Sequence, residues 1–290
     1  MAGRSVAVIG SATIDRITQG GKSVCRLGGV VTYGGLTFKR HGIETVVVTN
    51  VADRDESILK ALHEGSIRVF RGHTGNTTHF INHVDINTDS RWQEMPAKAD
   101  PITASQVVSV LDDVDHLHIG ALHPFDIDQE VIESLNKTNL LISMDVQGYV
   151  RYREGSRIRH RVSDNLAGAL SCAGIVKADE TELATILDSY KMDLAGLMRA
   201  YTIDEMVVTA GARRGGFIRN SAGDEIHYDA EPVESPACTV GAGDVFFAAY
   251  LVHRFYRGKG ISVSSGLAAS LAARQSEGRH ISAKTLRLER

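Results

Sequence analysis

The sequence predicts an α/β fold, a doubly wound and mostly parallel sheet flanked by helices, with a small β-strand lid. Short apolar runs rich in β-branched residues alternate with helical patterns along most of the 290 residues, as in strand–helix–strand units. Several of these runs are apolar at every position, which is typical of a parallel sheet buried on both faces. No repeat or linker interrupts them, so a single domain over residues 1–290 is expected.

The elements follow from local patterns. Six apolar runs are predicted as strands of the sheet: Ser5–Ile9, Thr45–Thr49, His116–Ile119, Leu140–Met144, Gly174–Val176 and Met206–Thr209. Helical spacing of apolar residues predicts helices over Val30–His41, Ser57–His63, Ala104–Leu111, Gln129–Asn136 and Glu180–Tyr190. A hairpin is expected over Gly215–Asn220 and Glu225–Asp229, and mostly helix from Ala242 to about Gln275.

Two polar segments depart from the alternation and predict the lid, over approximately residues 11–27 and 68–95. Arg16–Arg26 is polar and contains glycine, and Thr77–Val84 alternates polar and apolar side chains as an antiparallel strand does. A lid over the edge of the sheet would exclude water from a reaction there. The alternative is a surface hairpin without a gating role. Unpaired lid edges would also be templates for association, so a homodimer through the lid is expected.

The composition, 43% hydrophobic and 23% charged, is that of an ordinary globular protein. A net charge of −3 without a long run of one sign argues against nucleic-acid binding. The basic stretch Arg151–Arg161 favours a solvated connecting segment, and the alternative is that one or two of its arginines face an anion. Neither a signal peptide nor an apolar run near the ~20 residues of a membrane helix is seen, so a cytoplasmic protein is expected. Cys25, Cys172 and Cys238 lack disulfide or zinc spacing.

The most informative segment is Cys238–Asp244, which runs directly into the apolar run Val245–Leu251. Its two glycines let the backbone approach a ligand closely, and the start of the following helix offers unpaired N–H groups to an anion. Asp244 beside this anion site is well placed to take a proton from an attacking hydroxyl. These features predict a kinase that acts on an alcohol. The alternative is a turn in which Asp244 only caps the helix.

Five motifs, in order along nearly the whole chain, resemble those of the ribokinase-like, or PfkB, family of carbohydrate kinases. They are Gly10–Asp15, Gly28–Gly29 with the helix after it, Ala178–Glu182, Val207–Gly211 with Gly215–Gly216, and Cys238–Asp244. The resemblance implies the ribokinase-like form of the fold. It also implies transfer of the γ-phosphoryl group of ATP to a small polyol or sugar, with Mg²⁺ as cofactor. A monovalent cation near the Gly241 loop is a class feature of the family.

The resemblance implies a role for each motif. Asp244 would be the catalytic base beside an anion hole formed by the backbone N–H groups of Gly241, Ala242 and Gly243. The phosphate acceptor would be bound by Asp15, Gly28 and Gly29. The nucleotide would be bound by Lys177, Asp179, Thr209, Gly211 and Gly216. Glu182 would organise Mg²⁺ through water, and the alternative for Asp179 and Glu182 is a helix N-terminus that acidic residues stabilise.

Three positions depart from the common family pattern. Tyr33 stands where the first signature commonly has Asn, Asp179 replaces the Asn of the Asn-x-x-Glu element, and Cys238 replaces an Asp. The segment Met144–Arg151 resembles the branch that includes inositol kinases. Tyr33 also fits that branch. A cyclitol such as myo-inositol is therefore the expected acceptor, with a polar wall from Asp145, Gln147 and Arg151. A structural turn with a solvated Arg151 is the alternative.

Three other functions compete with this one. A nucleoside kinase of the same family would need an aromatic wall for the base, from Phe80, Trp92 and Tyr33. A polyol-binding regulator without catalysis is disfavoured because Asp244 and the glycine loop are intact. A metal-dependent hydrolase would use His116, His118 and His123 as metal ligands. His116 and His118 would share one face of a strand.

Overall fold

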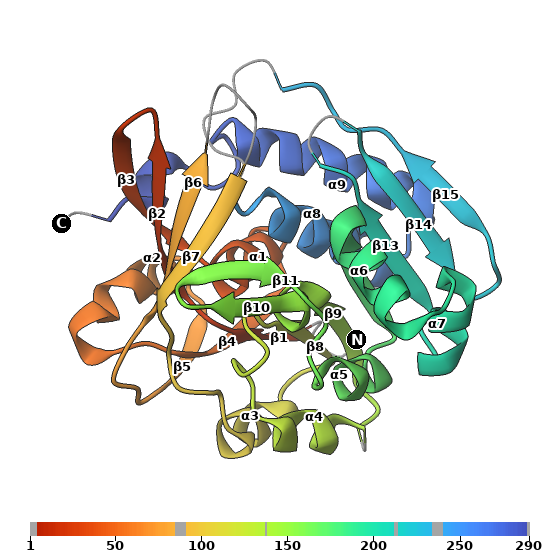
Figure 1. Ribbon diagram of the computed structural model, residues 1–290, viewed down its shortest axis with the longest axis horizontal. Helices are drawn as coiled ribbons and strands as arrows, with labels where there is room; N and C mark the ends of the chain where they lie inside the picture. The colour runs from red at the N-terminus through yellow and green to blue at the C-terminus, as the bar shows by residue number, and fades with distance from the viewer. Residues whose placement is uncertain (1–4, 85–90, 137, 212–213, 234–239, 289–290) are drawn as a thin grey trace.

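The computed structural model describes residues 5–84, 91–136, 138–211, 214–233 and 240–288, and these form two sheets with helices around the larger one (Figure 1). The larger sheet has nine strands in the order β15-β14-β13-β12-β9-β8-β1-β4-β5. All its ladders from β5 to β13 are parallel, whereas β14 and β15 are antiparallel. The predicted mixed α/β fold with a mostly parallel sheet is confirmed.

Each of the six predicted strands is present, and each observed end lies within three residues of the predicted one. The strands of the larger sheet are β1 (Ser5–Gly10), β4 (Glu44–Asn50), β5 (Arg68–Gly72), β8 (His116–Gly120), β9 (Leu141–Asp145), β12 (Ile175–Asp179), β13 (Glu205–Thr209), β14 (Gly216–Asn220) and β15 (Glu225–Tyr228). One expectation is wrong: Arg68–Gly72, assigned to the lid, pairs in parallel with β4 at the edge of the larger sheet.

Helices cover both faces of the larger sheet because alternate strand residues point to opposite sides. Val6, Val8 and Val47 join one core cluster, with α1 (Val30–Arg40), α2 (Lys60–Glu64), α8 (Ala242–Leu251), α9 (Ile261–Ser276) and α10 (Ala283–Leu286). Ala7, Ile9 and Val46 join the other, with α3 (Ala104–Leu111), α4 (Gln129–Leu135), α5 (Leu166–Cys172), α6 (Glu180–Tyr190) and α7 (Leu194–Tyr201). The sequence patterns missed α5 and α7. The predicted helix Ser57–His63 is a 3₁₀ turn, Asp53–Leu59, followed by α2.

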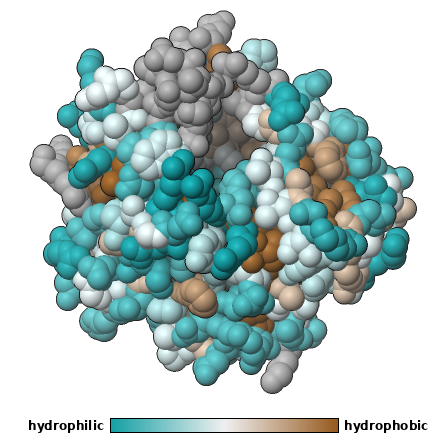
Figure 2. All heavy atoms as spheres, viewed as in Figure 1, coloured by the Kyte–Doolittle hydropathy of each residue, from teal (hydrophilic) through white to brown (hydrophobic). Residues whose placement is uncertain are grey.

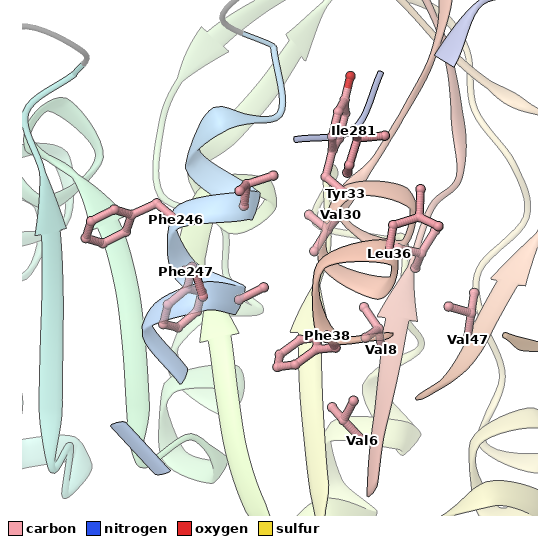
Figure 3. Packing of buried hydrophobic residues seen from close by; sticks show 14 of the residues in the cluster. Val6, Val8, Val30, Tyr33, Leu36, Phe38, Val47, Phe246, Phe247 and Ile281 are labelled. Atoms are coloured by element: carbon pink, nitrogen blue, oxygen red, sulfur yellow. The ribbon is translucent and has the colours of Figure 1, made fainter. Parts of the chain in front are cut away.

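The first cluster joins α1 and α8 to the centre of the sheet (Figure 3). Phe38 is fully buried on α1, and its ring meets those of His116, His118 and Tyr256 edge-on, with centroids 5.8 to 6.4 Å apart. Figure 3 shows Val6 at one end of this cluster and Tyr33 with Ile281 at the other. The packing fixes α1 and α8 relative to each other, and both helices begin at glycines of the predicted site.

The second sheet has six strands in the order β10-β11-β7-β6-β2-β3 and forms the predicted lid. The strands are β2 (Thr13–Gln19), β3 (Lys22–Gly28), β6 (Thr78–Val84), β7 (Arg91–Ala97), β10 (Arg151–Glu154) and β11 (Arg157–His160). The basic stretch Arg151–Arg161 is therefore a hairpin of the lid and not a simple connection, with Arg151 buried and Arg153, Arg157 and Arg159 exposed. Residues 85–90 of the predicted lid lie outside the described part of the chain.

The lid has two distinct faces. Asp15 pairs with Phe80 across β2 and β6, and both are buried on the inner face. On the outer face the ring of His83 stacks on that of Trp92 with centroids 3.7 Å apart. Because successive strand residues alternate between faces, Phe80 and His83 point in opposite directions.

The face of the molecule drawn in Figure 2 is mostly hydrophilic, with separate hydrophobic patches. Within the ranges that the structure describes, no helix is both long enough and apolar enough to cross a membrane.

Candidate active site

A buried ion pair lies at the carboxyl ends of β9 and β12, where ligands of doubly wound sheets bind. Asp145 and Lys177 are register partners, and the Lys177 Nζ lies 2.6 Å from the Asp145 Oδ2. Burial alone would lower the pKa of the Lys177 ammonium, but the charges of Asp145 and Glu182 outweigh burial and raise it. Lys177 is therefore a charged ammonium inside the protein at neutral pH.

The first turn of α8 brings a helix N-terminus to this ion pair. Gly241 precedes the helix with a φ of 80°, a left-handed conformation that favours glycine. Ala242 begins the helix, and a Cβ at Gly243 would lie 3.7 Å from the Lys177 Nζ. The turn therefore passes close to the ammonium, and the two together make an electropositive position for an anion. Cys238, the residue that departs from the family pattern, lies outside the described residues.

Asp244, also in the first turn of α8, is half-buried beside the same charges. The loss of surrounding water, followed by the charge of Asp145, raises the pKa of its carboxyl to about 7, although Lys177 and Arg151 oppose the shift. A carboxylate with a pKa near 7 is ionised in a large fraction at neutral pH and is a stronger base than an ordinary aspartate. The position and the pKa of Asp244 both suit a general base.

Asp15 reaches this group of charges from the lid. It is buried, and its Oδ1 accepts a hydrogen bond of 2.7 Å from the Thr13 Oγ1. Burial raises the pKa of Asp15 to about 6, and Thr13 and Arg151 oppose that effect. A Cβ at Gly28 would lie 2.4 Å from both the Asp15 Oδ2 and the Thr13 Oγ1. The close approach of β3 to this carboxylate therefore requires glycine.

Arg151 connects the lid to the carboxyl ends of the larger sheet. It is the first residue of β10, it is buried, and its guanidinium lies 5.3 Å from the centroid of the Phe80 ring. Burial lowers the pKa of Arg151, and the shift is opposed by four carboxylates, those of Glu182, Asp145, Asp15 and Asp244. The alternative of a solvated Arg151 is wrong, since the side chain faces the acidic groups of the site.

Glu182 and Asp179 form a reciprocal capping box at the start of α6. The Glu182 N donates to the Asp179 Oδ1 at 2.8 Å, and the Asp179 N donates to the Glu182 Oε2 at 2.7 Å. Glu182 is buried, and burial followed by the charge of Asp145 raises its pKa to about 7. The capping role is thus real, but it uses only one of the two carboxylate oxygens of Glu182.

The predicted nucleotide-binding residues lie along one edge of the larger sheet. Asp179, Thr209 and Gly216 are register partners across β12, β13 and β14, so the three positions are adjacent. Gly211 follows β13 at an exposed position with a φ of 83°. Lys177 is two residues before Asp179 on β12, which joins this edge to the buried ion pair.

Tyr33 is a buried residue of α1. Its exposed fraction is 1%, its hydroxyl donates to the Leu27 carbonyl at 3.3 Å, and a Cβ at Gly241 would be 2.4 Å from its ring. The phenol ring therefore packs against the glycine that precedes α8. The contact of Tyr33 with the acceptor stays a prediction. Gly29, with a φ of 90°, approaches the Ser11 carbonyl as closely as only glycine can.

Gln147 and two amide residues of the lid also lie near the site. The Gln147 N donates to the Asp145 Oδ1 at 3.0 Å, and its side chain is partly exposed. Asn82 and Gln93 were not predicted, and their amides are hydrogen-bonded to each other on the face of the lid that carries Asp15. The alternation of Thr77–Val84 was the available signal, because it puts Asn82 on the same face as Phe80.

The donor set fits a magnesium ion that is held mainly through water. The charge of Asp145 acts on both Glu182 and Asp244, and each of the three offers the hard carboxylate oxygens that Mg²⁺ prefers. No group of three His, Cys, Asp or Glu side chains close enough to hold a metal ion occurs among the described residues. The carboxylates would therefore act on the water shell of the ion.

The histidines do not form the metal site of a hydrolase. The His116 Nε2 and the His118 Nδ1 lie 2.7 and 2.8 Å from the same Ser143 Oγ. Burial lowers the pKa of both, that of His118 to about 4, so both are neutral core residues. His123 belongs to a separate group, since its backbone N donates to Asp126.

The family model for pfkB family carbohydrate kinases matches residues 4–285. The chain belongs to the PfkB family. PfkB proteins are phosphotransferases, so the protein is an enzyme that transfers a phosphoryl group to an alcohol. No curated protein matches the chain.

Solved structures of ribokinase-family kinases share the fold. A pyrophosphate-dependent kinase of the ribokinase family, in complex with sulfate, is 22% identical with a TM-score of 0.82, over 94% of this chain and 95% of that one. The nucleoside kinase of Burkholderia thailandensis in complex with inosine is 14% identical with a TM-score of 0.76, over 96% and 92%. The ribokinase of Thermotoga maritima is 17% identical with a TM-score of 0.72, over 98% and 96%.

Replacing Gly28 by alanine is expected to impair the acceptor side of the site. The new Cβ would displace the Asp15 carboxylate and the Thr13 hydroxyl, which lie 2.4 Å from its position. We expect the KM for the acceptor to rise roughly tenfold or more, as for the loss of a hydrogen bond to a charged group, with the donor KM unchanged. Gly266→Ala is the control, because no atom lies within 4 Å of its Cβ position. An unaltered acceptor KM in Gly28→Ala would contradict the role of Asp15.

The raised pKa of Asp244 predicts how stability depends on pH. An aspartate has a pKa near 3.9 when the chain is unfolded and about 7 here, so the folded protein holds the proton more tightly. The stabilisation from this group is complete below about pH 4 and is lost as the pH rises through 7. Asp244→Asn removes this loss, so its Tm should exceed that of the parent protein by more at pH 8 than at pH 5. Asp188→Asn, at an exposed position, should show no such divergence in a thermal melt.

Proposed function

We propose that this protein transfers the γ-phosphoryl group of ATP to a hydroxyl of a small polyol, with a cyclitol such as myo-inositol as the favoured acceptor. The observation that carries the proposal is the position of Asp244. Its carboxylate, with a pKa of about 7, lies in the same helical turn that offers N–H groups to an anion beside Lys177. A base and an anion site in one turn are what an attacking hydroxyl and a transferred phosphoryl group require together.

The residues divide the reaction between them. Asp244 accepts the proton of the attacking hydroxyl as the new P–O bond forms, while the bond from the γ-phosphorus to the bridging oxygen breaks and ADP leaves with that oxygen. The backbone N–H groups of Gly241, Ala242 and Gly243 and the ammonium of Lys177 stabilise the negative charge on the transferred group. Asp15 and Arg151 hold other hydroxyls of the acceptor under the lid, which excludes water. Bound Mg²⁺ supplies further charge neutralisation, with Glu182 as a partner of its water shell.

The polarity of the inner face of the lid supports a polyol. Asp15, Arg151 and Asn82 are buried polar or charged side chains on that face or beside it, and a polyhydroxylated ring can pair with all of them. The solved structures of similar fold include a pyrophosphate-dependent kinase in complex with a pyrophosphate analogue and myo-inositol, 22% identical with a TM-score of 0.81 over 94% of this chain and 95% of that one.

A nucleoside is the runner-up acceptor, and the lid supports it less well. Trp92 lies on the outer face, stacked on His83, and Tyr33 is buried under the α8 loop. Of the three aromatic residues expected to form a wall for the base, only Phe80 is on the inner face, where Arg151 covers it. The inosine complex of the Burkholderia thailandensis enzyme keeps nucleosides in the panel of acceptors to be tested.

Pyrophosphate is the second candidate donor, because it is the donor of the similar ribokinase-family structure. Both donors present a terminal phosphate to the α8 turn and Lys177, so the proposed chemistry of the acceptor is the same.

We also propose a homodimer through the lid. The strand β3 forms an edge of the lid sheet, and Val24 on it is 48% exposed.

Substitution of Asp244 tests the mechanism. With ATP or pyrophosphate, Mg²⁺ and a panel of cyclitols, sugars and nucleosides, we expect Asp244→Ala to lower kcat about 10²- to 10⁴-fold and to leave donor binding nearly unchanged in calorimetry. In the parent enzyme, kcat should fall as the pH drops through 7, because protonated Asp244 cannot act as the base.

Asp188→Ala is the matched control, an exposed aspartate whose loss should leave kcat unaltered. Near-normal turnover by Asp244→Ala would remove Asp244 as the base. Turnover with nucleosides alone would overturn the polyol assignment and keep the mechanism. Turnover with pyrophosphate alone would replace ATP as the donor. Binding of a polyol without turnover of any donor would indicate the regulator.

A further inference from the structure

Three imidazoles meet at the carboxyl end of α1, whereas the start of this helix faces the reaction centre. His41 follows α1 directly, and its Nδ1 donates a hydrogen bond of 2.9 Å to the Thr37 carbonyl. The centroid of the His41 ring lies 5.6 Å from that of His253 and 6.4 Å from that of His280. His253 belongs to the π-helical turn η3 (Val252–Tyr256), which continues α8. Such turns are rare and occur often at functional sites.

Four cationic side chains surround the three imidazoles: Arg40, Arg257, Lys259 and Arg274. The Arg40 Nη1 donates to the His280 carbonyl, and the Arg257 Nη2 donates to the His41 carbonyl at 3.4 Å. Burial, followed by the neighbouring positive charges, lowers the pKa of His253 and that of His280 to about 4. The imidazoles and the four cations together are called the basic cluster below.

The positive charge of the basic cluster has no carboxylate to balance it. Within the described ranges, none of its four cations forms an ion pair with a carboxylate. The carboxylates of the adjoining segments pair with other cations: Glu44 with Lys39, Glu277 with Arg279, and Glu205 with Arg254. Burial also lowers the pKa of Arg40. Partly buried cations without a counter-charge favour the binding of an anion.

His253 adds a polar atom that lacks a partner. Its side chain is only 8% exposed, and its Nδ1 is buried without a hydrogen-bond partner among the residues that the structure describes. A buried polar atom in this state is costly and is a place where an ion or a water completes the hydrogen bonding. Arg257 and Lys259, which follow η3, are exposed, so the cluster is open to solvent on that side.

We propose that the basic cluster is a binding site for a phosphate group, carried either by free phosphate or by a phosphate monoester. The oxygens of a phosphate accept hydrogen bonds, and guanidinium, ammonium and imidazole N–H groups donate them. A metal ion does not suit the cluster, because the surrounding charges are positive. In the described part of the chain, moreover, no three His, Cys, Asp or Glu side chains are placed to hold a metal ion.

The proposed site is separate from the reaction centre. Asp244 is in the first turn of α8, and His253 lies nine residues later, in the turn that continues this helix. At 1.5 Å per residue the two positions are about 14 Å apart along the axis. A phosphate group at the basic cluster is therefore neither the transferred group nor part of the donor bound at the α8 turn. The inference goes beyond the proposed function and does not depend on it.

The test follows the imidazole C–H signals in NMR spectra while inorganic phosphate replaces sodium chloride at constant ionic strength. We expect the signals of His41, His253 and His280 to shift along one saturating curve. His227 is the internal control, because it is exposed beside Glu225 on β15, and its signals should not follow that curve. A bound anion should also raise the pKa of His280 above about 4, because it opposes the neighbouring positive charges. A second titration with glycerol 3-phosphate distinguishes a monoester from the free ion.

Variants at the exposed rim decide the assignment. Arg257→Gln should weaken phosphate binding roughly tenfold or more, as for the loss of a hydrogen bond to a charged group, and the double variant with Lys259→Gln should weaken it further. Arg199→Gln is the matched control, since Arg199 is exposed on α7 at the other face of the sheet, and it should leave the affinity unaltered. Shifts without saturation with either probe, or an unchanged affinity in the double variant, would overturn the inference. Neither result bears on the proposed function, because no turnover is measured.

Discussion

The concentration of buried charge around the Lys177–Asp145 ion pair is the constraint on which the site depends. Four carboxylates and two cations meet at the carboxyl ends of the larger sheet and the inner face of the lid: Asp15, Asp145, Glu182, Asp244, Lys177 and Arg151. Burying charges is tolerable only where they are paired, and the two cations cannot pair with all four carboxylates. Burial first, and then for Glu182 and Asp244 the charge of Asp145, raises the pKa values of Asp15, Glu182 and Asp244, which suits Asp244 to the proposed role of a base at neutral pH.

Two glycines and the phenol of Tyr33 position the segments that carry these charged side chains. Gly28 lets β3 approach the Asp15 carboxylate, and Gly241 lets the α8 loop lie on the ring of Tyr33. The Tyr33 hydroxyl reaches back to the carbonyl of Leu27, next to Gly28. One buried side chain on α1 thus contacts both the glycine before α8 and the strand β3, which lies beside Asp15.

The sequence predicted the elements whose patterns are local, and failed where pairing between distant segments decides. Alternation of apolar runs located the parallel strands, and the glycine motif located Asp244. The polar run from Arg68 and the arginines from Arg151 were misassigned, because a strand at a sheet edge and a lid hairpin both look like solvated segments. Asn82 was missed for a related reason: its pairing with Gln93 depends on the register of β6 against β7, which no single segment encodes.

Charged groups of the lid and of the larger sheet act on one another, and together they decide how much negative charge a phosphate donor would meet. Arg151 begins a lid strand but balances carboxylates of the sheet end, while Asp15 is a lid residue that acts on the charge of Asp244. When every group is ionised, the four carboxylates and two cations leave a net charge of −2. A phosphate donor adds more negative charge to this centre, and α8 with Lys177 offers only part of the compensation. In the proposed reaction a divalent cation would supply the remainder, so we expect donor binding and the ionisation of Asp244 to depend on the same electrostatic balance.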